Sequence, residues 1–215
     1  VNGSFTNEPK PHKVTIAWGD GSTTVLSSSD VTYDPVTGLF TFSATHTYAD
    51  DPAGEDDVYL ISITVEEDVD GSMETPATAQ LQVTVNNVSP QHLAITPDGG
   101  NDYHEGQELK FTASATDPAG ANDTLTYDWV VTKDGVEYVT GSGPEITFMP
   151  DDDGIYSIEL TVTDEDGGLT TLTYPGIDVS NVSPTLTIDG AATVAEGATY
   201  TLNLSSSDPG TDTIS

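Results

Sequence analysis

The sequence predicts an all-β protein built from tandem two-sheet sandwiches in an elongated array. The tetrapeptide Asn-Val-Ser-Pro begins at Asn87 and again at Asn181, 94 residues later. Val, Ile, Leu and Thr alternate with polar residues in short runs, and clusters of Gly, Asp, Asn and Pro separate these runs. Alternation with frequent turn signals is typical of antiparallel strands, and no segment has a helical period.

The repeat extends beyond the tetrapeptide. Glu105-Gly106 recurs as Glu196-Gly197, and Asp117-Pro118 recurs as Asp208-Pro209, both 91 residues later. A period of this size indicates one complete β-domain per repeat. We therefore expect a sandwich over residues 1–88 that lacks its first strand, a complete sandwich over 89–182, and the opening strands of a third repeat over 183–215.

The two ends fall inside repeats. Residues 1–9 match the segment from Phe111 to Pro118, and the last residues stop before a third tryptophan. The favoured interpretation is a segment of a much longer polypeptide. The alternative is donor-strand exchange, in which the C-terminal strands complete the first sandwich of another copy.

The complete unit is expected to contain seven strands, each bounded by turn residues. The residues Lys133-Asp134-Gly135 predict a tight hairpin turn. The strands are expected at Leu93–Ile95, Glu108–Ala115, Thr124–Thr132, Val136–Thr140, Glu145–Phe148, Tyr156–Thr163 and Leu169–Val179.

Each of the first two units has one tryptophan on an alternating strand. In such a sandwich, a tryptophan at this place is expected in the core, covered by the second sheet. We expect Tyr59 and Tyr156 at corners where a strand enters the core and the tyrosine hydroxyl bonds nearby backbone. The predicted cores are Trp18 with Tyr59, Ile61 and Ile63, and Trp129 with Tyr156, Ile158 and Leu160.

The motifs Trp18-Gly19-Asp20-Gly21-Ser22 and His46-Thr47-Tyr48, followed by the strand with Tyr59, resemble PKD-like domains. These are immunoglobulin-like sandwiches found in tandem on microbial surface proteins and in secreted hydrolases. The second unit departs from the pattern, because Val130-Val131-Thr132 follows Trp129 where the first unit has Gly-Asp-Gly. The resemblance implies spacers, adhesive modules or modules that contact polysaccharide.

The composition excludes several classes of partner. Four basic and 36 acidic residues give a formal charge of −32 and a pI near 4.1, and such a surface repels nucleic acid and anionic lipid. The sequence contains no run of 18 apolar residues, so it predicts no transmembrane helix in this segment. The low lysine content, with abundant Asp, Thr, Ser and Gly, favours a secreted, extracellular or cell-surface protein.

We do not expect an enzyme. The four histidines, His12, His46, His92 and His104, have neither metal-like spacing nor equivalent places in the repeats. Carboxylates are abundant, but a catalytic pair needs a cleft, and short sandwiches with small loops rarely form one.

The acidic loops are the candidate metal sites. In an immunoglobulin-like sandwich, loops from different strands meet at each end, so carboxylates of successive units should face each other at the junctions. Calcium, which takes 6 to 8 oxygen ligands, would convert their repulsion into a rigid joint, whereas magnesium fits such loops poorly. The alternative is that these are ordinary solvated turns.

The predicted ligands fall into two groups. The first junction is expected to use Asp117, Asp123, Asp164 and Asp166 around Asn87, facing Asp51, Glu55, Asp56 and Asp57 of the preceding unit. The second is expected to use Asp152, Asp153, Asn181, Asp208 and Asp212, with Glu105 as a further candidate from the turn after the first strand.

The predicted function is that of a non-enzymatic structural or adhesive region, rod-like and rigidified by calcium, in a large surface protein, surface layer or filament. The alternative is a polysaccharide-binding accessory region of a secreted hydrolase. The expected partners are neighbouring repeats or other copies, with a polysaccharide or cell-surface ligand as a further candidate.

Overall fold

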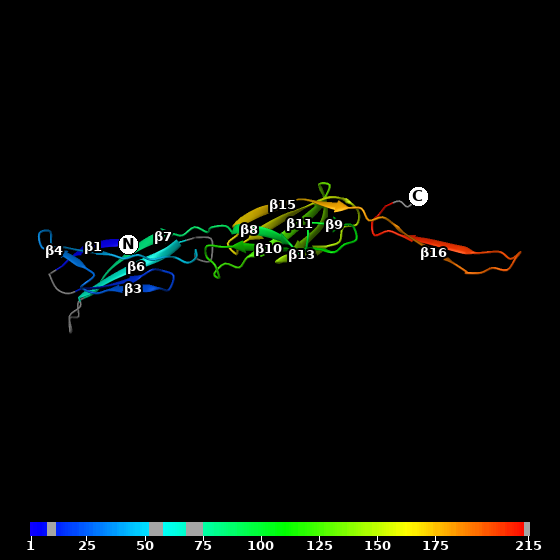
Figure 1. The fold of residues 1–215 in the computed structure, drawn as a ribbon. Coiled ribbons are helices and arrows are strands. Elements are labelled where there is room, and N and C mark those ends of the chain that lie inside the picture. Colours follow the sequence, from blue (N-terminus) through cyan, green and yellow to red (C-terminus); the bar gives the residue numbers. More distant parts are fainter. Residues whose placement is uncertain (8–11, 52–57, 68–74, 213–215) are drawn as a thin grey trace. The chain divides into compact units, whose positions relative to one another are not determined.

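The computed structural model describes residues 1–7, 12–51, 58–67 and 75–212, and it divides into two compact units, Val1–Val88 and Ser89–Ser215. All regular elements in these ranges are β-strands (Figure 1). The predicted all-β class is therefore confirmed. Within the described ranges, no helix has the length and apolar character that a membrane span requires.

The described residues of the first unit form seven strands in two sheets. One sheet has the order β1-β5-β4 and the other has the order β3-β2-β6-β7. All neighbouring strands are antiparallel. The strands are β1 (Asn2–Thr6), β2 (His12–Ala17), β3 (Thr23–Leu26), β4 (Thr32–Asp34), β5 (Leu39–Ser43), β6 (Val58–Glu67) and β7 (Ala77–Thr84).

The core of the first unit follows the alternation of β2. Val14 and Ile16 are fully buried, and Trp18, directly after this strand, is 2% exposed. As predicted, Ile61 is buried with them, and the partly buried Ile63 packs against the cluster. Tyr59 does not belong to the buried cluster. It is half-buried, it stacks on Tyr48, and its hydroxyl donates to the Asp50 carbonyl at 3.3 Å.

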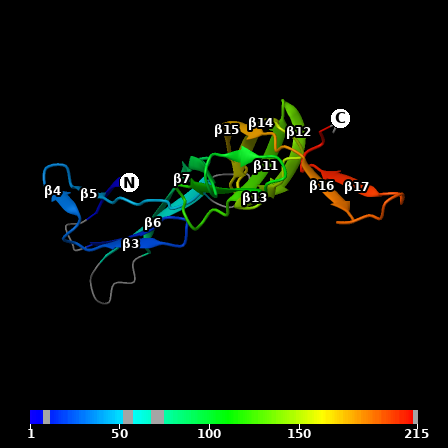
Figure 2. The same cartoon turned by 45° about the vertical axis from the view of Figure 1, so that its right-hand side comes forward.

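The second unit contains a sandwich with sheets in the orders β13-β10-β8 and β12-β11-β14-β15-β9. A hairpin of β16 and β17 follows it (Figure 2). The strands are β8 (Gln91–Pro97), β9 (Tyr103–His104), β10 (Leu109–Thr116), β11 (Thr126–Lys133), β12 (Val136–Ser142), β13 (Glu145–Phe148), β14 (Gly154–Thr163), β15 (Leu169–Ser180), β16 (Thr185–Gly190) and β17 (Leu202–Ser207).

Seven of these strands correspond to the seven expected ones, and β9 is an addition. It consists of two residues that pair in parallel with the end of β15, through Tyr103 opposite Val179 and His104 opposite Ser180. The predicted hairpin turn is confirmed. Asp134 and Gly135 both have positive φ, 49° and 80°, as a type I′ turn requires.

The second core is centred on Trp129, which is 1% exposed and lies opposite Leu160 across β11 and β14. Tyr156, Ile158 and Leu160 are fully buried on one face of β14, as predicted. The Trp129 indole N–H donates to the Gly143 carbonyl at 2.8 Å, and the Tyr156 hydroxyl donates to the Asp152 carbonyl at 3.1 Å. Buried aromatic groups thus have partners for their polar atoms.

Candidate metal centres

Three carboxylates of the second unit converge from two loops, one between β10 and β11 and the other between β14 and β15. Asp117 follows β10, Asp123 precedes β11 and Asp164 follows β14. One carboxylate oxygen from each lies within 4.8 Å of those of the other two. Asp123 and Asp164 are buried, and Asp117 is half-buried. The structure therefore brings together three of the residues predicted for the first junction.

Local hydrogen bonds hold two of these carboxylates in place. Asp117 Oδ1 accepts the Ala119 N–H at 2.9 Å, and Asp164 Oδ1 accepts the Gly168 N–H at 2.6 Å. Asp117 Oδ2 is buried without a hydrogen-bond partner. Two unit charges 4 Å apart repel by roughly 4 kcal/mol at an effective dielectric constant near 20, so a hard cation would stabilise such a cluster.

The other residues expected at this junction are placed differently. Asp166 is exposed at the tip of the turn that Gly167 closes with a φ of 87°, so it does not join the group of three. Asn87 belongs to the first unit, where it is half-buried. Asp51 is buried at the end of a described segment, and Glu55, Asp56 and Asp57 lie outside the described residues.

A second set of carboxylates surrounds Glu105, in the turn after β9. Glu105 is 2% exposed, and its backbone N–H donates to the Ser180 carbonyl at 3.2 Å. Its Oε1 accepts the Val182 N–H at 2.7 Å, while Oε2 is buried without a hydrogen-bond partner. A buried carboxylate oxygen without a donor is destabilising unless a cation binds it.

Glu105 takes part in two groups of three, each with one oxygen per residue within 4.8 Å of the others. One group contains Asp208 and Asp212, and the other contains Asp152 and Asp153. The Asn181 amide donates to Asp212 Oδ2 at 2.8 Å, which places Asn181 beside the first group. The structure thus places the five residues expected at the second junction around Glu105, which was the further candidate there.

The carboxylates of this second set lie close together, so their negative charges repel one another. Desolvation, followed by the charges of neighbouring carboxylates with Glu105 first, raises the pKa of Asp212. Asp208 Oδ2 and Asp152 Oδ1 are also buried without hydrogen-bond partners. Lys133 contacts Asp152 Oδ2 at 3.5 Å and Asp151 Oδ1 at 3.3 Å, so it neutralises part of the charge at the edge of the set. The donor atoms are hard oxygens, which suit calcium.

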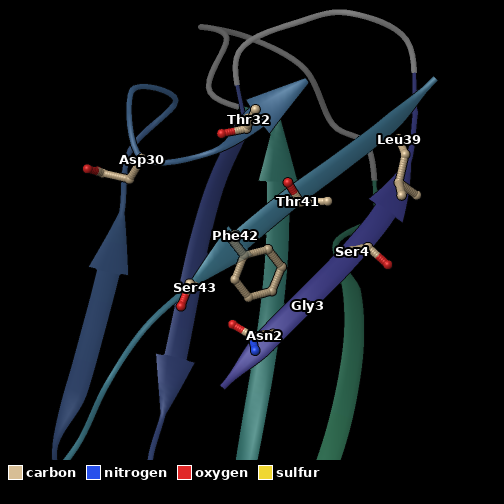
Figure 3. A pocket seen from close by; sticks show the side chains of 9 residues that line it. All are labelled: Asn2, Gly3, Ser4, Asp30, Thr32, Leu39, Thr41, Phe42 and Ser43. Atoms are coloured by element: carbon tan, nitrogen blue, oxygen red, sulfur yellow. The ribbon is translucent and has the colours of Figure 1, made fainter. Parts of the chain in front are cut away.

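The first unit has a surface hollow of about 650 Å³ over β1, β4 and β5 (Figure 3). Phe42 and Gly3 lie at its centre, and the rest of the lining is mostly small and polar. The titratable side chain in the lining is Asp30, whose carboxylate accepts the N–H and the hydroxyl of Ser27. A single carboxylate held in a turn does not provide a pair for acid–base chemistry.

Comparison with known proteins identifies one family. Residues 87–174 match the family model for the PKD domain. Motif resemblance was stronger in the first unit, whereas the family match covers β8 to β14 and part of β15 in the second. No curated protein matches the chain.

Two solved structures are similar at low identity. The fibronectin(III)-like modules of Clostridium thermocellum CbhA are 16% identical, with a TM-score of 0.33, over 83% of this chain and 84% of theirs. Escherichia coli alpha-2-macroglobulin activated by porcine elastase is 13% identical, with a TM-score of 0.30, over 95% of this chain and 20% of that protein. The family match therefore places the similarity to the PKD domain on the sandwich of the second unit, over residues 87–174.

Proposed function

We propose that this chain is a non-enzymatic structural or adhesive repeat region of an extracellular surface protein, surface layer or filament, and that calcium rigidifies it. The observation that carries the proposal is the convergence of carboxylates from separate loops of the PKD-containing unit, at Asp117, Asp123 and Asp164 and again around Glu105. The net charge of −32 supports a partner that is a cation rather than a polyanion.

Calcium would act by linking loops that are distant in sequence. At the first cluster it would join the loop between β10 and β11, which carries Asp117 and Asp123, to the loop between β14 and β15, which carries Asp164. Without a cation, repulsion among the three carboxylates favours separation of these loops. With calcium bound, the same oxygens become ligands, and the free energy of binding adds to the stability of the folded unit.

The burial of both tryptophans supports a structural role over the alternative of a polysaccharide-binding accessory region. Sugar stacking needs exposed aromatic faces, but Trp18 and Trp129 are 2% and 1% exposed. Under the alternative, stacking would have to come from tyrosines such as Tyr200, which is 47% exposed on the chain that precedes β17.

Calorimetric titration of the calcium-free chain with calcium chloride tests the proposal. The parent chain should bind calcium, and Asp117→Asn and Asp164→Asn should each weaken binding at the first cluster. The matched control is Asp128→Asn, which removes the same charge from an exposed position on β11. Absence of binding in the parent, or unchanged binding in both cluster variants, would mean that these loops are ordinary solvated turns.

A further inference from the structure

The two dipeptides that recur in the sequence contact each other in the second unit. Gly106 has a φ of 70°, and a Cβ at this position would lie 2.6 Å from Pro209 Cβ. A Cβ at Gly210 would collide with the Glu105 carboxylate. Glu105-Gly106 of one repeat therefore packs closely against Asp208-Pro209-Gly210 of the next, and both glycines are needed for this approach.

The centre of this contact is a buried carboxylate that is only partly satisfied. Glu105 Oε1 accepts one backbone N–H, from Val182, and the buried Oε2 has no hydrogen-bond donor. The same pattern occurs at Asp208, whose Oδ1 accepts the Gly210 N–H at 2.9 Å while Oδ2 is buried without a partner. These two unsatisfied oxygens belong to side chains that meet in one group.

Glu105 belongs to two groups of carboxylates, and each group offers oxygens for a cation of its own. Asp208 and Asp212 meet Glu105 in one group, and Asp152 and Asp153 meet it in the other. The five carboxylates carry five negative charges; one divalent cation would leave three of them uncompensated, and two would leave one. Lys133 contacts only the outer oxygen of Asp152, so it does not replace either cation at the buried oxygens.

We propose that Glu105 bridges two calcium ions, one held with Asp208 and Asp212 and the other with Asp152 and Asp153. The first ion also has Asn181 beside it, through the contact of that amide with Asp212. Together the ions fasten the loop after β17 to the end of the PKD sandwich. This inference rests on the proposed binding of calcium and specifies the number of ions, their ligands and the segment that they hold.

Native mass spectrometry of the full chain with calcium chloride tests the stoichiometry. Relative to the parent chain, Glu105→Gln should bind two fewer calcium ions. Asp212→Asn and Asp153→Asn should each bind one fewer, because each lies in only one group. Asp128→Asn should bind the same number as the parent, and Asp117→Asn should keep both ions at Glu105.

A second measurement separates loss of metal from loss of folding. Hydrogen exchange of residues 208–212 should slow on addition of calcium in the parent chain and stay unchanged in Glu105→Gln, with exchange in β11 and β14 the same in both. Asp208→Asn changes the loop alone and should also abolish the protection.

The outcomes distinguish this inference from the proposed function. If the parent chain binds no calcium, both are wrong. If the parent binds calcium and Glu105→Gln binds the same number, the site at Glu105 is wrong while binding at Asp117, Asp123 and Asp164 stands. A loss of only one ion in Glu105→Gln overturns the bridged pair.

Discussion

The imidazole of His46 stacks on the indole of Trp18, with ring centroids 4.7 Å apart and planes inclined by 16°. The same imidazole contacts Asp20 Oδ2 at 2.7 Å through Nε2. Asp20 in turn accepts the backbone N–H and the hydroxyl of Ser22, at 2.9 and 2.6 Å. The Trp-Gly-Asp-Gly-Ser and His-Thr-Tyr motifs are therefore joined around one aromatic ring, and they stabilise the turn between β2 and β3.

This arrangement predicts a loss of stability of the first unit in acid. The hydrogen bonds from Ser22, followed by the interaction with His46, lower the pKa of Asp20 from 3.8 to about 2. Because the pKa of the folded state is the lower one, ionised Asp20 stabilises the unit above about pH 3.8, and this contribution disappears as the pH falls towards 2. In Asp20→Asn, the unfolding free energy should be lower at pH 7 and should fall less between pH 4 and pH 2.

Urea unfolding at several pH values, followed by the NMR signal of the Trp18 indole N–H, measures this effect in the first unit. Asp128→Asn in the second unit is the control and should leave the signal of Trp18 unchanged. An identical pH dependence in Asp20→Asn and in the parent chain would contradict the assignment.

The core of the PKD domain predicts a large difference between two residues of β14. Leu160 is fully buried opposite Trp129, whereas Ile155 is 49% exposed. Leu160→Ala should lower the unfolding free energy of the second unit by about 2–5 kcal/mol, because it removes buried methyl groups and leaves a cavity. Ile155→Ala should cost clearly less. Urea unfolding followed by Trp129 fluorescence would check both variants, and equal losses would argue against this core.

The two Glu-Gly motifs provide a matched pair for the contact with Pro209. Gly106 and Gly197 both have positive φ, 70° and 80°, but a Cβ at Gly197 would meet no atom within 4 Å. Alanine at either position is strained by the backbone conformation, at a cost on the order of 1 kcal/mol. Only Gly106→Ala should also displace the loop that contains Pro209. Faster hydrogen exchange of residues 208–212 in Gly106→Ala, but not in Gly197→Ala, is the expected result.

The β16–β17 hairpin allows a test of donor-strand exchange. Its apolar side chains Leu186, Ile188 and Leu204 are more than half exposed. If another copy covers this hairpin, the chain should form a dimer that dissociates on dilution, and Ile188→Thr with Leu204→Thr should shift it to monomer. Light scattering after size exclusion measures the mass. A monomer at all concentrations would contradict donor-strand exchange.

Much of the fold could be predicted because it depends on local pattern. Tyr156, Ile158 and Leu160 alternate with polar residues, and the structure buries all three on one face of β14. Strand β9 could not be predicted, since its two residues pair in parallel with β15 and carry no alternation of their own. The position of Tyr59 was only partly predicted. Its hydroxyl does bond nearby backbone, but its ring stacks on Tyr48 and does not belong to the buried cluster.

In the candidate sites, too, the features that depend on local pattern could be predicted and those that depend on long-range contacts could not. Asp-rich loops are visible in the sequence, and of the residues that the sandwich topology places around Asn87, three carboxylates, Asp117, Asp123 and Asp164, lie together in the structure. The central place of Glu105 depends on a hydrogen bond to Val182, 77 residues later, and on the packing of Gly106 against Pro209. No local pattern encodes such contacts. The recurrence of Glu-Gly and Asp-Pro at one shared spacing was the available signal, because two motifs that repeat together can also meet in space.

The contact between Glu105-Gly106 and Asp208-Pro209-Gly210 is asymmetric, because different motifs form its two sides. The sandwich supplies the turn with Glu105, and the following repeat supplies the loop after β17 that packs against it. The two sides of the contact are therefore different and cannot be exchanged. The residues between them, from Asn181 to Pro184, set the distance over which the joint closes. Duplication or loss of a whole repeat would keep this distance, whereas insertion of a single residue between Val182 and Thr185 would not. The length of this short connection is therefore a constraint on the contact between Glu105-Gly106 and the loop after β17.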